Sequence, residues 1–270
     1  MVERLLDMAQ NLPLAKDTLS DKDKEYAERF YGYICAVADK SRALGYYAYR
    51  ADSGDFVAHY IAGLCYYLAF DFASARKCFE SICAKSDSQS TFRHIDSSEI
   101  QIDAKDLQKI KARCYNYLGL MYSEGHLERD YQKSFELQMQ AGDLGYCDGY
   151  GCVADMYRNG EGVAKDYNKA VEYYNKAGNM GAGWAYNSLG YMYQHGQGVN
   201  QNYKKAIELY QKACDLGNAS AFNSLGYMYQ HGQGVNQDYQ KAVELYQKAC
   251  DMGNETGCKN YRILRDELSI

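Results

Sequence analysis

The residues best able to do chemistry in this chain are a serine–lysine pair and two histidines in identical surroundings. Ser74 and Lys77 have the SxxK spacing of serine acyl-transfer sites, in which the serine is the nucleophile. Neither the SDN nor the KTG motif that completes such a site occurs in the sequence. His195 and His231 are candidates for a general base or a metal ligand, but no cysteine or carboxylate recurs beside both. We therefore expect no enzymatic activity, no metal site and no cofactor.

Ten cysteines carry the other reactive groups. No CxxC pair or histidine cluster accompanies them, which argues against zinc. The favoured interpretation is reduced, buried thiols that pack as small apolar side chains, and disulfides are the alternative. Cys83 and Cys114 are able to meet if the polar segment between them loops out.

The elements that must position any site are tandem helices. Residues 183–218 and 219–254 are identical at 29 positions. Each copy has two amphipathic halves joined by a Gly-rich turn, which predicts a helical hairpin that buries its apolar face against its neighbours. The frame extends back to about residue 112, because the Leu189–Gly190 pair aligns with Leu225–Gly226, Val153–Ala154 and Leu118–Gly119.

The spacing of small and aromatic residues in these copies resembles the Sel1-like repeat, a relative of the tetratricopeptide repeat. The matching positions are Leu189, Gly190, Tyr193, Gly196, Gly198, Val199, Lys205, Ala206, Tyr210, Lys212, Ala213 and Gly217. The resemblance implies an all-α fold, an α/α superhelical solenoid of hairpins, and a bacterial adaptor protein.

Cysteine-rich Sel1-like proteins of the Helicobacter type show some similarity to the chain as well. That similarity implies a possible disulfide between Cys250 and Cys258, because such proteins place a bridge at this junction of each repeat. In the preceding repeat Cys214 keeps the first position, but Phe222 occupies the second.

Three regions follow from the repeat frame. Residues 112–254 are four Sel1-like repeats, and 255–270 form a C-terminal capping helix. Residues 1–111 are an N-terminal helical region with helices expected at 24–38 and 44–50. This region includes a degenerate tetratricopeptide-like repeat at 56–89 and a polar, Ser-rich insertion at 86–106, which reads as a loop.

Charge and hydropathy exclude several function classes. The net charge is −5, the isoelectric point is about 5.6 and no basic stripe is present, which argues against binding to nucleic acid or to an anionic membrane. No apolar stretch has transmembrane length, and the N-terminus lacks the continuous apolar core of a signal peptide. We therefore expect a cytoplasmic protein.

The candidate binding residues lie on the first helices, which line the concave face if the solenoid is built like tetratricopeptide arrays. Asparagines there can donate to and accept from a peptide backbone, and aromatic residues can anchor it. The alternative, which stays open, is that each asparagine only bonds the neighbouring helix and sets the repeat spacing. The expected partner-binding residues are Asn116, Asp155, Arg158, Trp184, Asn187, Tyr191, Gln194, Asn223, Tyr227 and Gln230.

The function that these features predict is a non-enzymatic adaptor for a protein or peptide partner, in a regulatory, effector-neutralising or host-contact role. We expect a monomer or a weak homo-oligomer. Two alternatives remain. One is a secreted cysteine-rich protein with penicillin-binding or β-lactamase-like activity at Ser74. The other is self-association through Tyr191 and Tyr227.

Overall fold

A computed structural model describes residues 56–68, 70–84, 90–93, 99–102 and 104–268. The helices expected at 24–38 and 44–50 lie outside these residues. The chain divides into two compact units, Met1–Gly145 and Tyr146–Ile270. Each is described below by itself. No helix in the described ranges combines the length and the apolar character that crossing a bilayer requires.

Within its described residues, the N-terminal unit contains two helical hairpins. Helices α4 (Phe56–Leu68) and α5 (Phe72–Cys83) form the first, and α6 (Ala104–Ser123) and α7 (Tyr131–Asp143) form the second. Their shared core is built from buried aromatic and aliphatic side chains, among them Tyr60, Phe79 and Ile82. Cys114 is buried in this core with Cys78 and Cys83 packed against it, and burial raises the pKa of its thiol.

The polar insertion is not wholly a loop. Strands β1 (Ser90–Arg93) and β2 (Glu99–Ile102) pair antiparallel, with Ser90 opposite Ile102 and Arg93 opposite Glu99. The physical reason is that Ile100 and Ile102 alternate with polar residues, which is the two-residue period of a strand. The Ser-rich composition on either side obscured that short signal.

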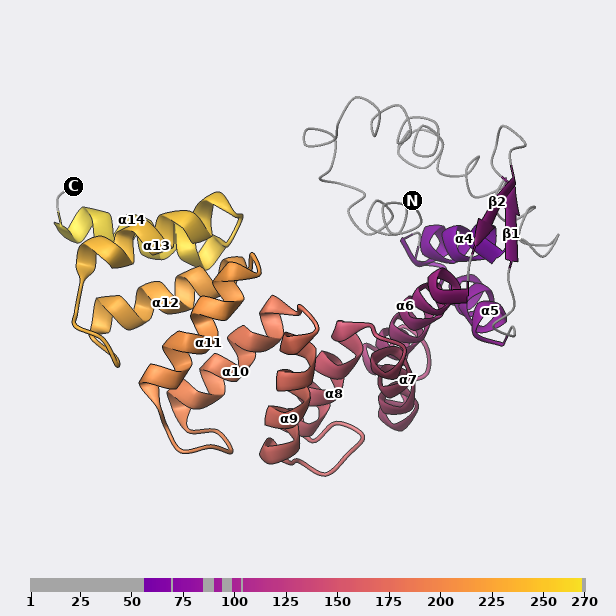
Figure 1. Ribbon diagram of the computed structural model, residues 1–270, viewed down its shortest axis with the longest axis horizontal. Helices are drawn as coiled ribbons and strands as arrows, with labels where there is room; N and C mark the ends of the chain where they lie inside the picture. The colour runs from indigo at the N-terminus through magenta and orange to yellow at the C-terminus, as the bar shows by residue number, and fades with distance from the viewer. Residues whose placement is uncertain (1–55, 69, 85–89, 94–98, 103, 269–270) are drawn as a thin grey trace. The chain divides into compact units, whose positions relative to one another are not determined.

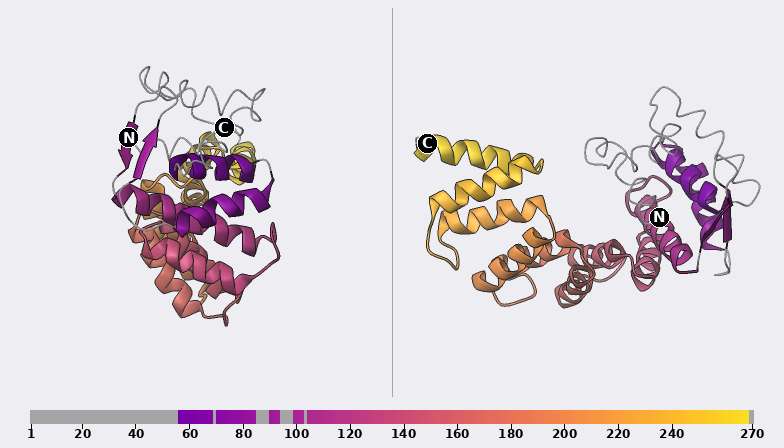
Figure 2. Two further views of the ribbon diagram at one scale, coloured as in Figure 1. Left: turned by 90° about the vertical axis from the view of Figure 1, so that its right-hand side faces the viewer. Right: turned by 45° about the horizontal axis from the view of Figure 1, so that its top comes forward.

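The C-terminal unit is a row of hairpins closed by a single helix. Figure 1 shows α8 (Cys147–Asn159) with α9 (Tyr167–Asn179), α10 (Gly183–His195) with α11 (Tyr203–Asp215), and α12 (Ala219–His231) with α13 (Tyr239–Asp251). Helix α14 (Glu255–Leu268) packs on the last hairpin. Two further views of these helices are in Figure 2. The arrangement is the α/α solenoid that the repeats predict.

Local chemistry fixes where these helices begin and end. Asp166, Asn202 and Asp238 each cap a second helix by accepting a hydrogen bond from a main-chain N–H of its first turn. The first helices end at the C-cap residues Gly160, Gly196 and Gly232, which adopt φ of 80°, 68° and 64°, a left-handed conformation that favours glycine. The repeated sequence therefore produces repeated helix boundaries.

A buried tyrosine fills the core of each hairpin in this unit. Tyr210 lies against Gly190, where a Cβ atom would be 2.7 Å from the tyrosine Cε1. Tyr174 and Tyr246 occupy the same position in the neighbouring repeats and are also fully buried. The chain has 29 tyrosines, and these interior positions explain part of that number, because an aromatic ring bridges the gap that the small residues leave.

One pair of cysteines departs from the favoured interpretation. Cys250 and Cys258 form a disulfide that joins α13 to α14, which is the pairing that the Helicobacter-type resemblance implied. The expectation of reduced thiols throughout does not hold for these two residues. Cys214, whose partner position is Phe222, remains a buried free thiol.

Candidate functional site

The first helices of the C-terminal unit expose two large aromatic side chains. Tyr191 on α10 is 45% exposed and Tyr227 on α12 is 40% exposed. Each ring packs on the histidine four residues later, His195 or His231, at 4.2 Å between ring centroids. The histidines thus support exposed tyrosines at the helix ends, and among the described residues no cluster of three metal-ligating side chains occurs. The two tyrosines are copies one repeat apart.

Two asparagines beside these tyrosines bond the following repeat. The Ser224 hydroxyl donates to Asn187 Oδ1 at 3.1 Å, and Asn260 Nδ2 donates to Asn223 Oδ1 at 2.8 Å. Ser224 lies on α12 and Asn260 on the capping helix α14, so each oxygen ties a first helix to the helix that packs beyond it, as the spacing interpretation supposed. Both side chains are half-buried, and each bond uses the oxygen, not the Nδ2 donor group.

The glutamines expected on the same face point inward. Gln194 is only 6% exposed, accepts the Tyr210 hydroxyl at 2.6 Å and donates to Gln233 Oε1 at 2.9 Å. Gln230 accepts the Tyr246 hydroxyl at 2.7 Å in the same way. Burial raises the pKa of both tyrosines, which keeps the hydroxyls protonated as donors. The side-chain oxygens of both glutamines therefore accept bonds from core tyrosines of the same hairpin.

The equivalent positions on α8 carry charges. Arg158 Nη2 forms a 2.8 Å ion pair with Asp155 Oδ1, and Tyr174 donates its hydroxyl to the same carboxylate at 2.5 Å. Burial and the nearby Asp155 charge raise the pKa of Tyr174. The core tyrosine of this repeat therefore donates to a carboxylate, whereas Tyr210 and Tyr246 in the next two repeats donate to a glutamine oxygen. Arg158 is directed toward the surface, with 30% of its side chain exposed.

Trp184 and Asn116 do not lie on an open face. The Trp184 ring packs so closely over Gly151 that a Cβ there would be 2.2 Å from the ring, and its Nε1 donates to Asp148 Oδ1 at 2.7 Å. It joins α10 to α8 inside the C-terminal unit. Asn116 belongs to the N-terminal unit and is 6% exposed.

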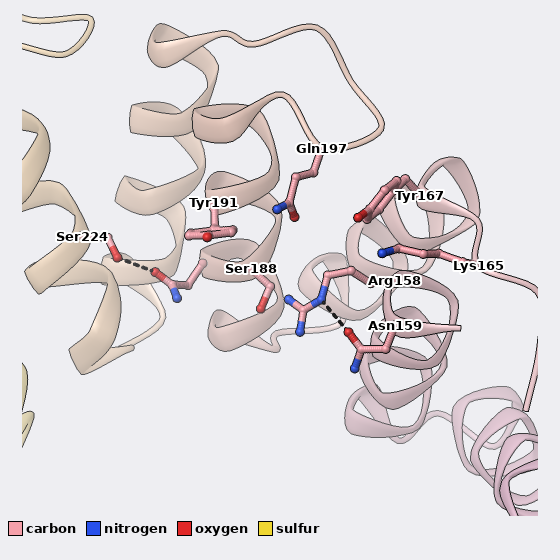
Figure 3. A pocket seen from close by; sticks show the side chains of 9 residues that line it. Arg158, Asn159, Lys165, Tyr167, Ser188, Tyr191, Gln197 and Ser224 are labelled. Atoms are coloured by element: carbon pink, nitrogen blue, oxygen red, sulfur yellow. Dashed lines mark hydrogen bonds between the residues drawn. The ribbon is translucent and has the colours of Figure 1, made fainter. Parts of the chain in front are cut away.

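A pocket of about 490 Å³ opens on the first-helix face. Figure 3 shows Arg158 and Lys165 pointing into a space that Tyr191 and Gln197 border from the other side. Arg158, Asn187 and Tyr191 were expected from sequence, whereas six lining residues were not: Asn159, Lys165, Tyr167, Ser188, Gln197 and Ser224.

The signal that could have found this pocket is a departure from the repeat. Arg158 and Lys165 stand where the next repeat has Gln194 and Gln201. In that next repeat, Gln194 donates a hydrogen bond to Gln233 of the repeat that follows it. Arg158 instead pairs with Asp155 and donates from Nε to Asn159 Oδ1 at 3.5 Å. The glutamine bridge is thereby replaced by an open, cationic pocket.

The serine of the SxxK pair, Ser74, has a structural role at the start of α5. The hydroxyl and the main-chain N–H of Ser74 hydrogen bond to the Asp71 carboxylate, which lowers the pKa of Asp71. Asp71 is the N-cap of this helix. The Ser74 oxygen therefore belongs to a helix cap.

Comparison with known proteins identifies the repeats. The Sel1 repeat model matches residues 112–146, 142–181, 185–218 and 220–254. A comparison with curated proteins finds no match.

Solved structures with the same fold include c5321 of uropathogenic Escherichia coli, described as a protective antigen with an SLR fold. It is 26% identical over 99% of this chain and 52% of its own, with a TM-score of 0.65, so the present chain spans about half its length. A Sel1 repeat protein from Oxalobacter formigenes is 23% identical over 72% of this chain and 70% of its own, with a TM-score of 0.55. Cysteine-rich protein B of Helicobacter pylori is 28% identical over 49% and 96%, with a TM-score of 0.41. With four matched repeats covering its C-terminal half, the chain belongs to the Sel1 repeat family.

Proposed function

We propose that the C-terminal unit binds an extended segment of a protein partner along the face formed by α8, α10 and α12, without catalytic activity of its own. Sel1 repeats generally mediate protein–protein interaction. The observation that carries the proposal is the pair Tyr191 and Tyr227, two large rings left 45% and 40% exposed one repeat apart. Exposed tyrosines at regular spacing are characteristic anchors of interfaces.

The asparagines complete the face. Because Asn187 and Asn223 use their oxygens to bond α12 and the capping helix α14, their Nδ2 groups are oriented by the same bonds. An oriented amide donor loses little entropy when it bonds a peptide carbonyl. The spacing role and the binding role are therefore compatible in one side chain.

The test is selection from a random dodecamer peptide library with the full chain as bait. The double variant Tyr191→Ala, Tyr227→Ala removes the two anchors. Leu216→Ala, Met252→Ala is a matched control, since these side chains are also copies one repeat apart, each 46% exposed, but at the ends of the second helices. We expect selected peptides to bind the tyrosine variant at least about tenfold more weakly and the control as the wild type. Equal binding to both variants would place the site elsewhere.

A further inference from the structure

We propose that the pocket at Arg158 and Lys165 binds a carboxylate of the partner segment, from an acidic side chain or a free C-terminus. The inference rests on the proposed function and adds the chemistry that the face selects. It starts from the lining of the pocket, which includes two cationic side chains and several amides and hydroxyls but no carboxylate. A ligand group that accepts hydrogen bonds and carries negative charge matches that lining.

Two hydrogen bonds hold the Arg158 guanidinium in an orientation suited to binding a carboxylate. Asp155 takes one hydrogen bond from Nη2, and Asn159 takes one from Nε. A guanidinium has five N–H donors, so others remain for a ligand. Asp155 itself is engaged by both Arg158 and the Tyr174 hydroxyl. The pairing restrains Arg158 without closing the pocket, in which Figure 3 shows its guanidinium facing the space near Ser188.

Lys165 supplies the second positive charge. Its Nζ lies 4.8 Å from the centroid of the Tyr167 ring, which also lines the pocket. The lysine therefore rests on an aromatic face and points its charge at the pocket (Figure 3). A partner carboxylate would meet a lysine charge and a guanidinium fork in one place, which is a stronger attraction than one exposed ion pair provides.

The neighbouring repeat provides the internal comparison. It has the neutral Gln194 and Gln201 at these two positions, and the Gln194–Gln233 bond spans the same gap. The cationic pair is thus a local change in an otherwise repeated surface. The selectivity for a carboxylate should be confined to the step between α8 and α10.

The test compares wild type with Arg158→Gln, Lys165→Gln, which gives the pocket the residues of the next repeat and so preserves side chains known to this fold. Lys204→Gln, Lys248→Gln is the matched control, since it removes the same charge from exposed positions on the second helices. Two dodecamer libraries are screened, one with a blocked and one with a free C-terminus. We expect wild type and control to enrich an acidic residue in both libraries, or the free C-terminus in one.

The pocket variant should bind peptides without that preference. For the best peptide, replacing the acid by its amide should weaken binding to wild type about tenfold and leave binding to the pocket variant nearly unchanged. Peptides that bind with no preference for an acidic residue or for a free C-terminus would overturn this inference and leave peptide binding intact. A carboxylate preference that survives in the pocket variant would overturn it as well. If no peptide binds, or if replacing Tyr191 and Tyr227 by alanine leaves peptide binding unchanged, the proposed function is wrong. The inference about the pocket, which rests on it, is then wrong as well.

Discussion

The Tyr210 hydroxyl donates to Gln194 Oε1 at 2.6 Å in the interior of the α10–α11 hairpin. The Nε2 group of Gln194 in turn donates a hydrogen bond to Gln233 Oε1, in the turn of the next repeat. One buried chain of hydrogen bonds therefore links a second helix, a first helix and the following turn. Because Gln194 is nearly inaccessible to water, its partners cannot be replaced freely by solvent.

Tyr210→Phe tests this chain. The change removes one hydroxyl and leaves a buried amide oxygen unsatisfied, so we expect the free energy of unfolding to fall by about 1–3 kcal/mol. Urea denaturation followed by circular dichroism measures it. Tyr246→Phe is the matched control, because its acceptor Gln230 is half-buried and water can take over the bond. Equal losses at the two sites would show that burial of the acceptor is unimportant.

Gly190→Ala tests the close approach of α10 to Tyr210. In an exposed helix this change would stabilise by up to about 1 kcal/mol. Here the new Cβ would lie 2.7 Å from the tyrosine ring, so we expect a loss of about 1–3 kcal/mol in urea titrations. Gly190→Leu should lose more, with amide exchange accelerated within the C-terminal unit and little changed in the N-terminal unit. Faster exchange throughout both units would contradict the modular picture.

The preceding repeat supplies a compensating change. There Ala154 stands at the position of Gly190, and Tyr174 donates to Asp155, the counterpart of Tyr191. Gly190→Ala combined with Tyr191→Asp should therefore recover part of the lost stability, which a double-mutant cycle measures. Strict additivity of the two changes would show that the carboxylate does not rescue the tyrosine.

The repeats made most of the fold predictable. Periodic Leu, Gly, Ala and Tyr positions specify which helix faces are buried, because each face meets the same neighbours in every copy. Asp166, Asn202 and Asp238 follow the same logic at the helix starts. The short β-hairpin was missed, since four-residue strands leave little periodic signal.

The candidate site was less predictable. Helical spacing places Asn187, Tyr191 and Gln194 on one stripe, but the angle between hairpins decides which of them the next repeat covers. That angle buries Gln194 and leaves Tyr191 exposed. The position of Trp184 over Gly151 depends on the same angle, because it needs contact between two different first helices.

The Cys250–Cys258 disulfide yields a prediction about the capping helix. Mass mapping of the purified chain without reductant should find these two residues linked. Reduction should then lower the free energy of unfolding by about 2–3 kcal/mol, as expected for closure of a short loop, and accelerate amide exchange in α14. Cys258→Ser should reproduce both effects without reductant.

If both thiols of Cys250 and Cys258 can be alkylated in protein purified without reductant, the bridge is not formed. A persistent bridge would favour an oxidising compartment over the expected cytoplasmic one.

The free thiol of Cys214 should make stability depend on alkaline pH. Burial, with a smaller contribution from the charge of Asp215, raises the pKa of this thiol to about 12. In the unfolded chain the pKa of a cysteine is about 8.5. Above that pH the unfolded state has lost a proton that the folded state retains, so the free energy of unfolding falls as pH rises.

The difference in unfolding free energy between wild type and Cys214→Ala should therefore be constant below about pH 8 and shrink steadily up to pH 10.5. Urea titrations at each pH measure it, and alkylation of Cys214 by iodoacetamide should stay slow over the same range. A difference independent of pH, with rapid alkylation at pH 9, would mean that the thiol is open to solvent.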